Sequence, residues 1–247
     1  MVPSGTRVSP KTTPLVEGNP VRNELLLGLP KQECDLIFSE LTFVQLRTHD
    51  VLQDTEEPIN YAYFVDSGMV SILSVMEDGK SVEVGLTGKE GCTALQLAAG
   101  FKTSDTRAVV QIAGTAFRLD SQRLVKVLRQ CPALSRRMQQ YGLFLAMQGA
   151  QVAACNRLHE VDERLARWLL MTQDRAHSNT FHVTQEFLAF MLGVRRVGVT
   201  KAASALQERN LIRYSRGDIT VLDRRGLKAA SCGCYKADRA SYDRTLG

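Results

Sequence analysis

The sequence predicts an α+β protein with an N-terminal antiparallel β-roll (jelly-roll), a long dimerisation helix and a C-terminal winged helix-turn-helix. Three observations lead to this fold class. Short strand-like runs separated by turns fill residues 42–119. A heptad repeat of apolar residues follows over 134–155. Two helical patterns joined at a glycine, and then a hairpin pattern, occupy residues 183–222.

The 247 residues suffice for two modest domains, and changes of pattern set the boundaries. Residues 1–20 are rich in Pro, Ser, Thr and Gly, and we expect a disordered leader there. The other expected segments are a β-roll effector domain over 21–125, a dimerisation helix over 126–158, a winged helix-turn-helix over 159–230 and a tail over 231–247.

The β-roll is predicted from alternating apolar residues and from the turns between them. A helix over 23–41, broken near Gly28-Leu29-Pro30, precedes it. Turn sequences such as Asp66-Ser67-Gly68 and Ala113-Gly114 divide the apolar runs. The expected strands are 42–46, 61–65, 69–75, 81–86, 107–112 and 115–119.

The long helix carries apolar residues at alternating spacings of four and three. A helix that packs on its own β-roll is one explanation. A twin helix accounts better for so regular a repeat, so we expect a homodimer. The residues of this predicted seam are Leu134, Met138, Tyr141, Leu145, Gln148, Val152 and Cys155.

The helix-turn-helix begins at Thr184, which can cap the first helix. Gly193 supplies the left-handed residue of the turn, and a second helix is expected from Arg195 to Arg209. Such a pair can be a plain structural hairpin. Cations at the start of the second helix favour insertion into a DNA major groove instead. The candidate contacts are Thr184, Arg195, Arg196, Val197 and Lys201.

A wing is predicted directly after the second helix. Residues 211–214 and 219–222 alternate β-formers around the turn Ser215-Arg216-Gly217-Asp218. Arg213 and Arg216 lie where they can reach DNA phosphates. From Asn156 onward the chain carries sixteen Lys and Arg against ten Asp and Glu, whereas the first 155 residues have a net charge of −1. This asymmetry favours a polyanion-binding C-terminal part.

Composition and missing motifs limit the other function classes. No apolar run is long enough to span a bilayer, and the N-terminus has no apolar signal core, so we expect a cytoplasmic protein with no membrane partner and with reduced cysteines. The chain has no P-loop, no GxSxG and no HExxH motif, and we expect no enzymatic activity.

With this order of domains, the chain resembles the CRP/FNR family of bacterial transcription regulators. The resemblance covers about residues 23–227. Its most specific parts are Gly193-Val194-Arg195-Arg196, Asn210-Leu211-Ile212 and the β-roll run 63–70. It implies a homodimer that binds a palindromic operator on double-stranded DNA, responds to an effector and works with RNA polymerase.

The resemblance also bears on single residues of the second helix. Arg196 matches the family's guanine-reading arginine, a strong bidentate pairing. Val197 stands where the family has a glutamate that reads cytosine, so the operator should differ from the family's usual half-site. Lys201 matches a later cation of the same helix.

The effector pocket implied by the resemblance would use Gly91, Cys92, Thr93, Arg107, Ala108, Tyr141, Leu145 and Gln148. Cyclic-nucleotide-binding members hold the ribose with a glutamate, and Cys92 stands at that position here. Gly149-Ala150 replaces the Thr-Ser pair that contacts adenine. Arg107 matches the phosphate-clamping arginine, although a structural strand arginine is an equal interpretation. We therefore expect either an unknown small-molecule effector other than cAMP, seated near Arg107, or a form that binds DNA with no effector at all.

Other sensor chemistries have weaker support. Cys34 is the one cysteine near the N-terminus, too few for an iron–sulfur cluster, and His49 is the one histidine in the β-roll. Cys232-x-Cys234 offers two metal ligands, which do not make a site, so no metal or cofactor is predicted. Cys92 and Cys155 are candidate redox thiols. The alternative function is a cyclic-nucleotide-binding or redox-sensing module whose main output is not DNA binding.

Overall fold

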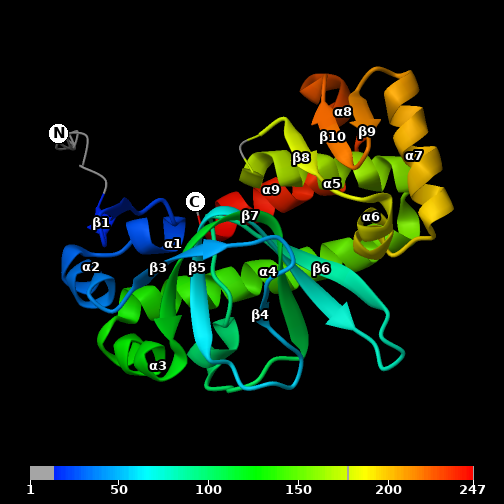
Figure 1. Ribbon diagram of the computed structural model, residues 1–247. Helices are drawn as coiled ribbons and strands as arrows, with labels where there is room; N and C mark the ends of the chain where they lie inside the picture. Colours follow the sequence, from blue (N-terminus) through cyan, green and yellow to red (C-terminus); the bar gives the residue numbers. More distant parts are fainter. Residues whose placement is uncertain (1–13, 177, 247) are drawn as a thin grey trace, which may run out of the picture.

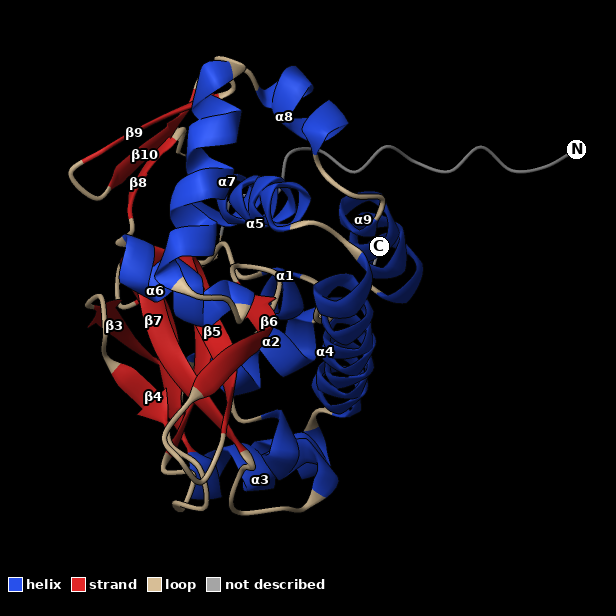
Figure 2. Ribbon diagram, turned by 90° about the vertical axis from the view of Figure 1, so that its right-hand side faces the viewer, coloured by secondary structure: helices blue, strands red, loops and turns tan. Residues whose placement is uncertain are grey.

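The computed structural model describes residues 14–176 and 178–246. Figure 1 shows the β-roll with the long helix α4 (Pro132–Leu158) running behind it, and a second, mainly helical region above one end of α4. Figure 2 shows α4 along one side of the β-roll. The predicted α+β class and the order of its parts are confirmed. None of the helices in the described ranges has the length and apolar character needed to cross a membrane.

The β-roll is one antiparallel sheet. Its order is β3 (Thr42–Leu46), β7 (Thr106–Asp120), β5 (Tyr61–Val75) and β6 (Ser81–Thr87), and β4 (Val51–Gln53) pairs with the far end of β7. The sequence did not predict β4, because three residues are too few to display an alternation.

β5 and β7 are long bent strands where the sequence predicted four short ones. The predicted turns at Gly68 and Gly114 are irregular points in the pairing of the two strands. A Cβ on Gly68 would lie 2.5 Å from the Ile112 carbonyl oxygen, and one on Gly114 would lie 2.2 Å from the Ser67 carbonyl oxygen. The glycines therefore allow two backbones to approach closely without ending either strand.

Short elements close the ends of the β-roll. Asn23 caps α1 (Glu24–Leu27), and α2 (Lys31–Phe38) follows after Pro30, as the break in the sequence predicted. η1 (Leu95–Ala99) and α3 (Ser121–Gln130) complete this domain. The predicted leader is wrong for residues 15–20, where β1 (Leu15–Val16) pairs with β2 (Asn19–Pro20), because Val16 is buried in the core. Residues 1–13 of that leader lie outside the described residues.

The C-terminal region holds the predicted helix pair and wing. α5 (Val161–Ala176) is almost wholly buried and carries Trp168 into the core. α6 (Gln185–Leu192) and α7 (Arg196–Glu208) form the helix pair. A small antiparallel sheet consists, in spatial order, of β8 (Thr180–His182), β10 (Asp218–Val221) and β9 (Ile212–Ser215). The helix α8 (Arg224–Ala230) follows it in the chain.

The predicted tail is a helix. α9 (Cys234–Thr245) returns to lie along α4, and both views place the two side by side (Figures 1 and 2). Gln148 donates from Nε2 to Asp238 Oδ1 at 3.1 Å, and the rings of Phe144 and Tyr242 meet edge to face with centroids 5.6 Å apart. The sequence did not predict this helix, because only a few apolar positions in α9 mark its buried face.

The predicted dimer seam must be corrected. Its residues pack within the chain, against the β-roll with its flanking helices α1 and α3, and against α9. The Tyr141 hydroxyl hydrogen-bonds Thr87, and Gln148 Oε1 accepts from the backbone N–H of Leu86 at 2.7 Å. Buried positions of the seam are Leu134, Met138, Tyr141, Gln148, Val152 and Cys155, and Leu145 is half-buried. The heptad spacing reflects a helix with one face on its own domain, the explanation that the sequence left open.

Candidate nucleic-acid interface and ligand cavity

The turn between α6 and α7 has the geometry predicted for a helix-turn-helix. The Thr184 hydroxyl accepts from the Phe187 N–H at 3.2 Å and so caps α6. Gly193 adopts φ 59°, the left-handed conformation that ends the helix. A Cβ at Gly193 would lie 3.2 Å from a methyl group of Val82, so this turn rests on strand β6 of the β-roll.

The start of α7 presents the predicted contact residues to solvent. Arg195, Arg196, Val197 and Lys201 are all exposed, and Val197 is 61% exposed although it is apolar. The first turn of α7 contains no acidic residue. The N-terminal end of the α7 dipole and the two arginines therefore give this end of the helix a positive field.

A groove of about 410 Å³ lies between the start of α7 and the wing. It collects Thr184, Arg196 and Arg216, which are far apart in the sequence. Gln185, which was not among the predicted residues, accepts at Oε1 from the Thr200 hydroxyl at 3.0 Å and from Arg196 Nε at 3.5 Å. Its side chain positions Arg196, and as an ordinary first-turn glutamine it gave no sequence signal.

Two residues with positive φ angles form the turn of the wing. Arg216 has φ 53° and Gly217 has φ 89°, the paired positive values of a tight hairpin turn. A Cβ on Gly217 would lie 2.8 Å from the ring of His182, an exposed side chain that can turn away, so the positive φ is what favours glycine there. Arg216 is exposed at the tip and Arg213 is exposed on β9. Both predicted wing cations therefore point to solvent.

A second hollow, of about 510 Å³, lies between the β-roll and α4. Most of its lining is apolar, and none of the described residues around it is charged. Its polar side chains are Gln53, Thr93, Gln96 and Thr106, together with the thiol of Cys92. Gly142, Leu145, Ala146 and Gly149 form the wall that α4 provides.

Half of the predicted effector residues meet in this cavity. Cys92, Thr93, Ala108 and Leu145 line it. Burial raises the pKa of the Cys92 thiol well above its ordinary value. Cys92 is therefore a neutral thiol, the unreactive form, and this argues against a redox role for it.

The other four predicted residues have different partners. Arg107 Nε donates to Asp54 Oδ1 at 2.7 Å at the surface, and Gln148 bridges β6 to α9. The ring of Tyr141 occupies the space beside Gly91, where any Cβ would lie about 2 Å from it. Arg107 is thus paired with Asp54 as a strand arginine can be, and it is not among the residues that line the cavity.

Gln53 gives the cavity a specific polar feature. Its side chain is buried and Nε2 donates to the Thr106 carbonyl at 3.3 Å, but Oε1 has no hydrogen-bond partner among the described residues. An unpaired buried acceptor is costly unless something donates to it. A donor that reached this oxygen, from water or from a rearranged neighbour, would satisfy it.

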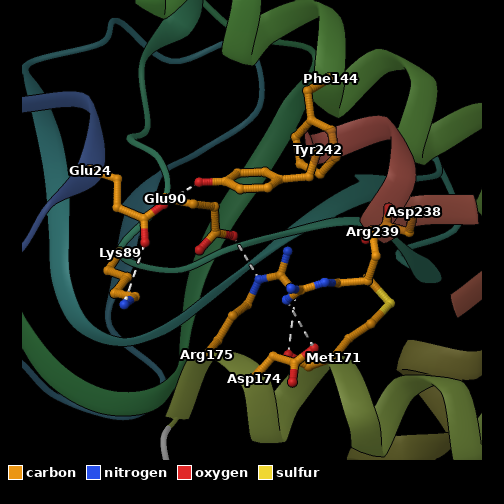
Figure 3. A pocket seen from close by; sticks show the side chains of 10 residues that line it. All are labelled: Glu24, Lys89, Glu90, Phe144, Met171, Asp174, Arg175, Asp238, Arg239 and Tyr242. Carbon is orange, nitrogen blue, oxygen red and sulfur yellow. Dashed lines mark hydrogen bonds and ion pairs between the residues drawn. The ribbon is translucent and has the colours of Figure 1, made fainter. Parts of the chain in front are cut away.

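A charged junction joins the β-roll to α5 and α9 around a small hollow of about 90 Å³ (Figure 3). Arg175 Nε donates to Glu90 Oε1 at 2.7 Å, with both side chains about nine-tenths buried. The Tyr242 hydroxyl bonds Glu24, and Arg239 lies 3.6 Å from Asp174. The hollow is too small for an effector, so we assign its residues to holding the two regions together.

A last group of polar side chains lies at the C-terminal end of α4, and the sequence pointed to only two of its residues, Cys232 and Cys234, as candidate metal ligands. Cys232 and Cys234 lie beside Cys155 and His159 at the end of α4, with the candidate ligand atoms of all four residues within 4.8 Å of one another. We call these four residues the C-terminal cysteine cluster.

Comparison with protein families finds two matches, one for each region. Residues 43–131 match the cyclic nucleotide-binding domain, and residues 163–230 match the Crp-like helix-turn-helix domain. No curated protein matches the chain by sequence.

Solved structures show the same fold over most of the chain. One is described as a transcriptional regulator of the crp/fnr family from Eubacterium rectale, with 16% identity, TM-score 0.66, and coverage of 83% of this chain and 96% of that one. FixK2 from Bradyrhizobium japonicum has 17% identity, TM-score 0.66, and coverage of 78% and 98%. The c-di-GMP-responsive global regulator CLP of Xanthomonas campestris has 14% identity, TM-score 0.64, and coverage of 78% and 100%.

Proposed function

Because the chain belongs to the CRP/FNR family of transcription regulators, we propose that it binds a palindromic DNA operator as a homodimer in the cytoplasm and that a small molecule controls this binding. RNA polymerase is the expected partner at the promoter. The observation that carries the proposal is the groove between α7 and the wing, where Thr184, Arg196 and Arg216 converge. A sensing module without DNA output would have no use for this groove.

We propose that α7 enters the major groove by its N-terminal end. Arg196 is the residue for guanine, since its guanidinium can pair with two acceptors of that base. Val197 suits a thymine methyl group beside it. Arg213, Arg216 and the capped start of α6 at Thr184 then face phosphates, which fix the position of the helix without reading sequence.

The dimer face we propose is the exposed face of α4. Leu143, Met147, Ala150, Ala154 and Leu158 recur there at spacings of three and four residues. Leu143 and Leu158 are 60% and 73% exposed in the single chain, which is unusual for leucines on a long helix. The alanines allow a close approach, so a second copy of α4 is the natural cover for this stripe.

We propose that the effector occupies the 510 Å³ cavity between the β-roll and α4. Its lining calls for an uncharged, largely apolar molecule. cAMP fits poorly, because its phosphate would meet no cation. Ala146 lines the cavity and is also exposed beside the proposed dimer face, so a ligand there would act directly on the packing of the two copies.

The test of DNA binding is selection of bound sequences from a random double-stranded pool with the purified full chain. We expect a palindrome whose half-sites are one helical turn, about 34 Å, apart. Enrichment of no sequence, or of one without symmetry, would contradict the proposal.

Calorimetric titration with cAMP tests the choice of effector. We expect no binding at micromolar concentrations. Low-micromolar binding together with a rise in operator affinity would overturn the assignment of an uncharged effector.

A further inference from the structure

The C-terminal cysteine cluster is assembled from two distant parts of the chain. Cys155 and His159 lie one helical turn apart at the end of α4, on the same face. Cys232 lies between α8 and α9, and Cys234, on the other side of Gly233, is the first residue of α9. The Cys155 and Cys232 sulfurs are 3.6 Å apart, and Cys234 Sγ is 3.6 Å from His159 Nδ1. The three cysteines are buried and His159 is half-buried.

We propose that this cluster is a Zn²⁺ site of the Cys₃His type. Zinc in structural sites takes four thiolate or imidazole ligands in a tetrahedron, with Zn–S distances of about 2.3 Å. Ligand atoms at the corners of such a tetrahedron are about 3.8 Å apart. The observed spacings of 3.6 Å and the overall limit of 4.8 Å match one metal ion, and they leave no room for a cluster of several irons.

The surroundings of the cluster suit bound thiolates. Gln151 Nε2 donates to Cys234 Sγ at 3.0 Å, the kind of contact that orients a ligand. Cys234 is the first residue of α9, a twelve-residue helix, where the helix dipole favours a negative charge.

Two buried arginines supply charge balance. Three thiolates around a divalent ion leave one net negative charge. Arg164 and Arg167 are buried and close enough to the Cys155 sulfur to act on it electrostatically. The Nε of each has no hydrogen-bond partner among the described residues. An anionic metal centre would offset the charge of these two buried arginines, although Arg164 also donates to the carbonyls of Asn156 and Leu192.

The metal would connect the two regions of the protein. α4 ends at Leu158 and α5 begins at Val161, so His159 lies in the two-residue joint between them. Cys232 and Cys234 follow the winged helix-turn-helix. A zinc ion held by both parts would fix the direction in which the DNA-binding region leaves α4. This coupling rests on the proposed function, whereas the metal site itself does not.

Metal content is the direct test. The full-length protein is purified under reducing conditions without a metal-affinity step, and zinc is measured by mass spectrometry. We expect one zinc per chain in the wild type and none in Cys155→Ser or Cys232→Ser. Cys131→Ser is the matched control, since Cys131 is equally buried outside the cluster and should keep its zinc. Circular dichroism checks that each variant is folded.

Cobalt exchange tests the ligand set independently of mutation. Co²⁺ in the wild type should give thiolate-to-cobalt charge-transfer bands and the visible bands of a tetrahedral site. Gln151→Ala should keep this spectrum but bind the metal about 10–100-fold more weakly. A wild type that takes up neither zinc nor cobalt, or one that forms a Cys155–Cys232 disulfide instead, would overturn the proposal.

Measurements of operator binding distinguish the proposed zinc site from the proposed DNA-binding function. Chelation of the metal should weaken binding to the selected operator at least tenfold and leave the dimer intact. Stoichiometric zinc with no specific DNA binding at all would disprove the proposed function and leave the metal site standing. Unchanged operator affinity after chelation would overturn the coupling between the site and the DNA-binding region.

Discussion

Arg175 and Glu90 form an ion pair with an Nε–Oε1 distance of 2.7 Å, and both side chains are about nine-tenths buried (Figure 3). Glu90 lies in the loop after β6, and Arg175 is in the last turn of α5. Glu90 also accepts from the Gly88 N–H at 3.1 Å. The β-roll and the DNA-binding region are therefore joined by a charge pair shielded from solvent, where screening by salt is weak.

Removing one partner of this pair should destabilise the protein strongly. Glu90→Gln removes the carboxylate bonded to the buried Arg175 guanidinium, on which Asp238 also acts, at a cost of about 3–5 kcal/mol. Urea unfolding measures the loss. The double variant Glu90→Gln/Arg175→Met removes the stranded charge and should regain much of the stability. If the free energy of unfolding of Glu90→Gln lay within about 0.5 kcal/mol of the wild-type value, the ion pair would have to be open to water.

Arg196→Ala should cost about 1–3 kcal/mol of affinity for the selected operator and relax the preference at one base pair of each half-site. Binding titrations on the operator and on single-base variants measure both effects. Arg209→Ala is the control, because Arg209 is exposed at the opposite end of α7. Arg216→Ala should weaken binding to all DNA sequences alike and should reduce the salt dependence of the affinity. Equal base preference in Arg196→Ala and wild type would exclude the proposed docking.

Leu143→Glu should give folded monomers that no longer bind the operator tightly. The substitution places like charges face to face in the proposed dimer interface while leaving the interior of the chain untouched, since Leu143 is 60% exposed. Sedimentation at micromolar concentration measures the assembly. Leu36→Glu changes an exposed leucine of α2 in the same way and should stay dimeric. A dimeric Leu143→Glu variant would place the interface elsewhere.

Stability should fall as the pH rises from about 4.5 to about 7, owing to Glu83. Burial raises the pKa of Glu83 to about 7, although Ser71 and Trp168 donate to its oxygens and Arg167 and Arg175 oppose the shift. In this range the folded protein holds a proton that the unfolded chain releases, so the stabilisation present at low pH is lost at up to about 1.4 kcal/mol per pH unit.

Glu83→Gln isolates this effect, because it keeps the shape and removes the titration. Melting temperatures of variant and wild type are compared between pH 5 and 8. The difference between them should change with pH in favour of the variant at the upper end. The pKa of Asp238 is also raised, chiefly by burial. Because Asp238 is present in both proteins, its contribution to the pH dependence cancels in the difference between their melting temperatures. Parallel melting curves across the range would show that Glu83 is ionised throughout.

The patterns that predicted the fold are local ones. Thr184, Gly193 and Gly217 each perform a backbone role that few other residues allow, so the helix pair and the wing can be placed within a few residues. In the sequence, Gly68 and Gly114 look like turn residues. A glycine that allows two paired strands to approach closely cannot be distinguished, from the sequence alone, from one at which the chain reverses.

The long helix and the cysteine cluster depend on contacts that a sequence does not display. The heptad over 134–155 indicates a buried face, but whether that face meets a second copy or the β-roll depends on where β6 and α9 lie. Likewise Cys232 and Cys234 suggest only two ligands, because Cys155 and His159 are more than seventy residues earlier in the chain.

The return of α9 onto α4 has a consequence for biosynthesis. Residues 234–245 are translated after every element on which they pack, and the Tyr242 hydroxyl bonds Glu24 in the first helix of the chain's described part. Until that stretch leaves the ribosome, Phe144 and Gln148 lack their covering partners. The covered face of α4 is therefore completed only after α9 has been made, and a nascent chain halted after the wing would present that uncovered face to chaperones.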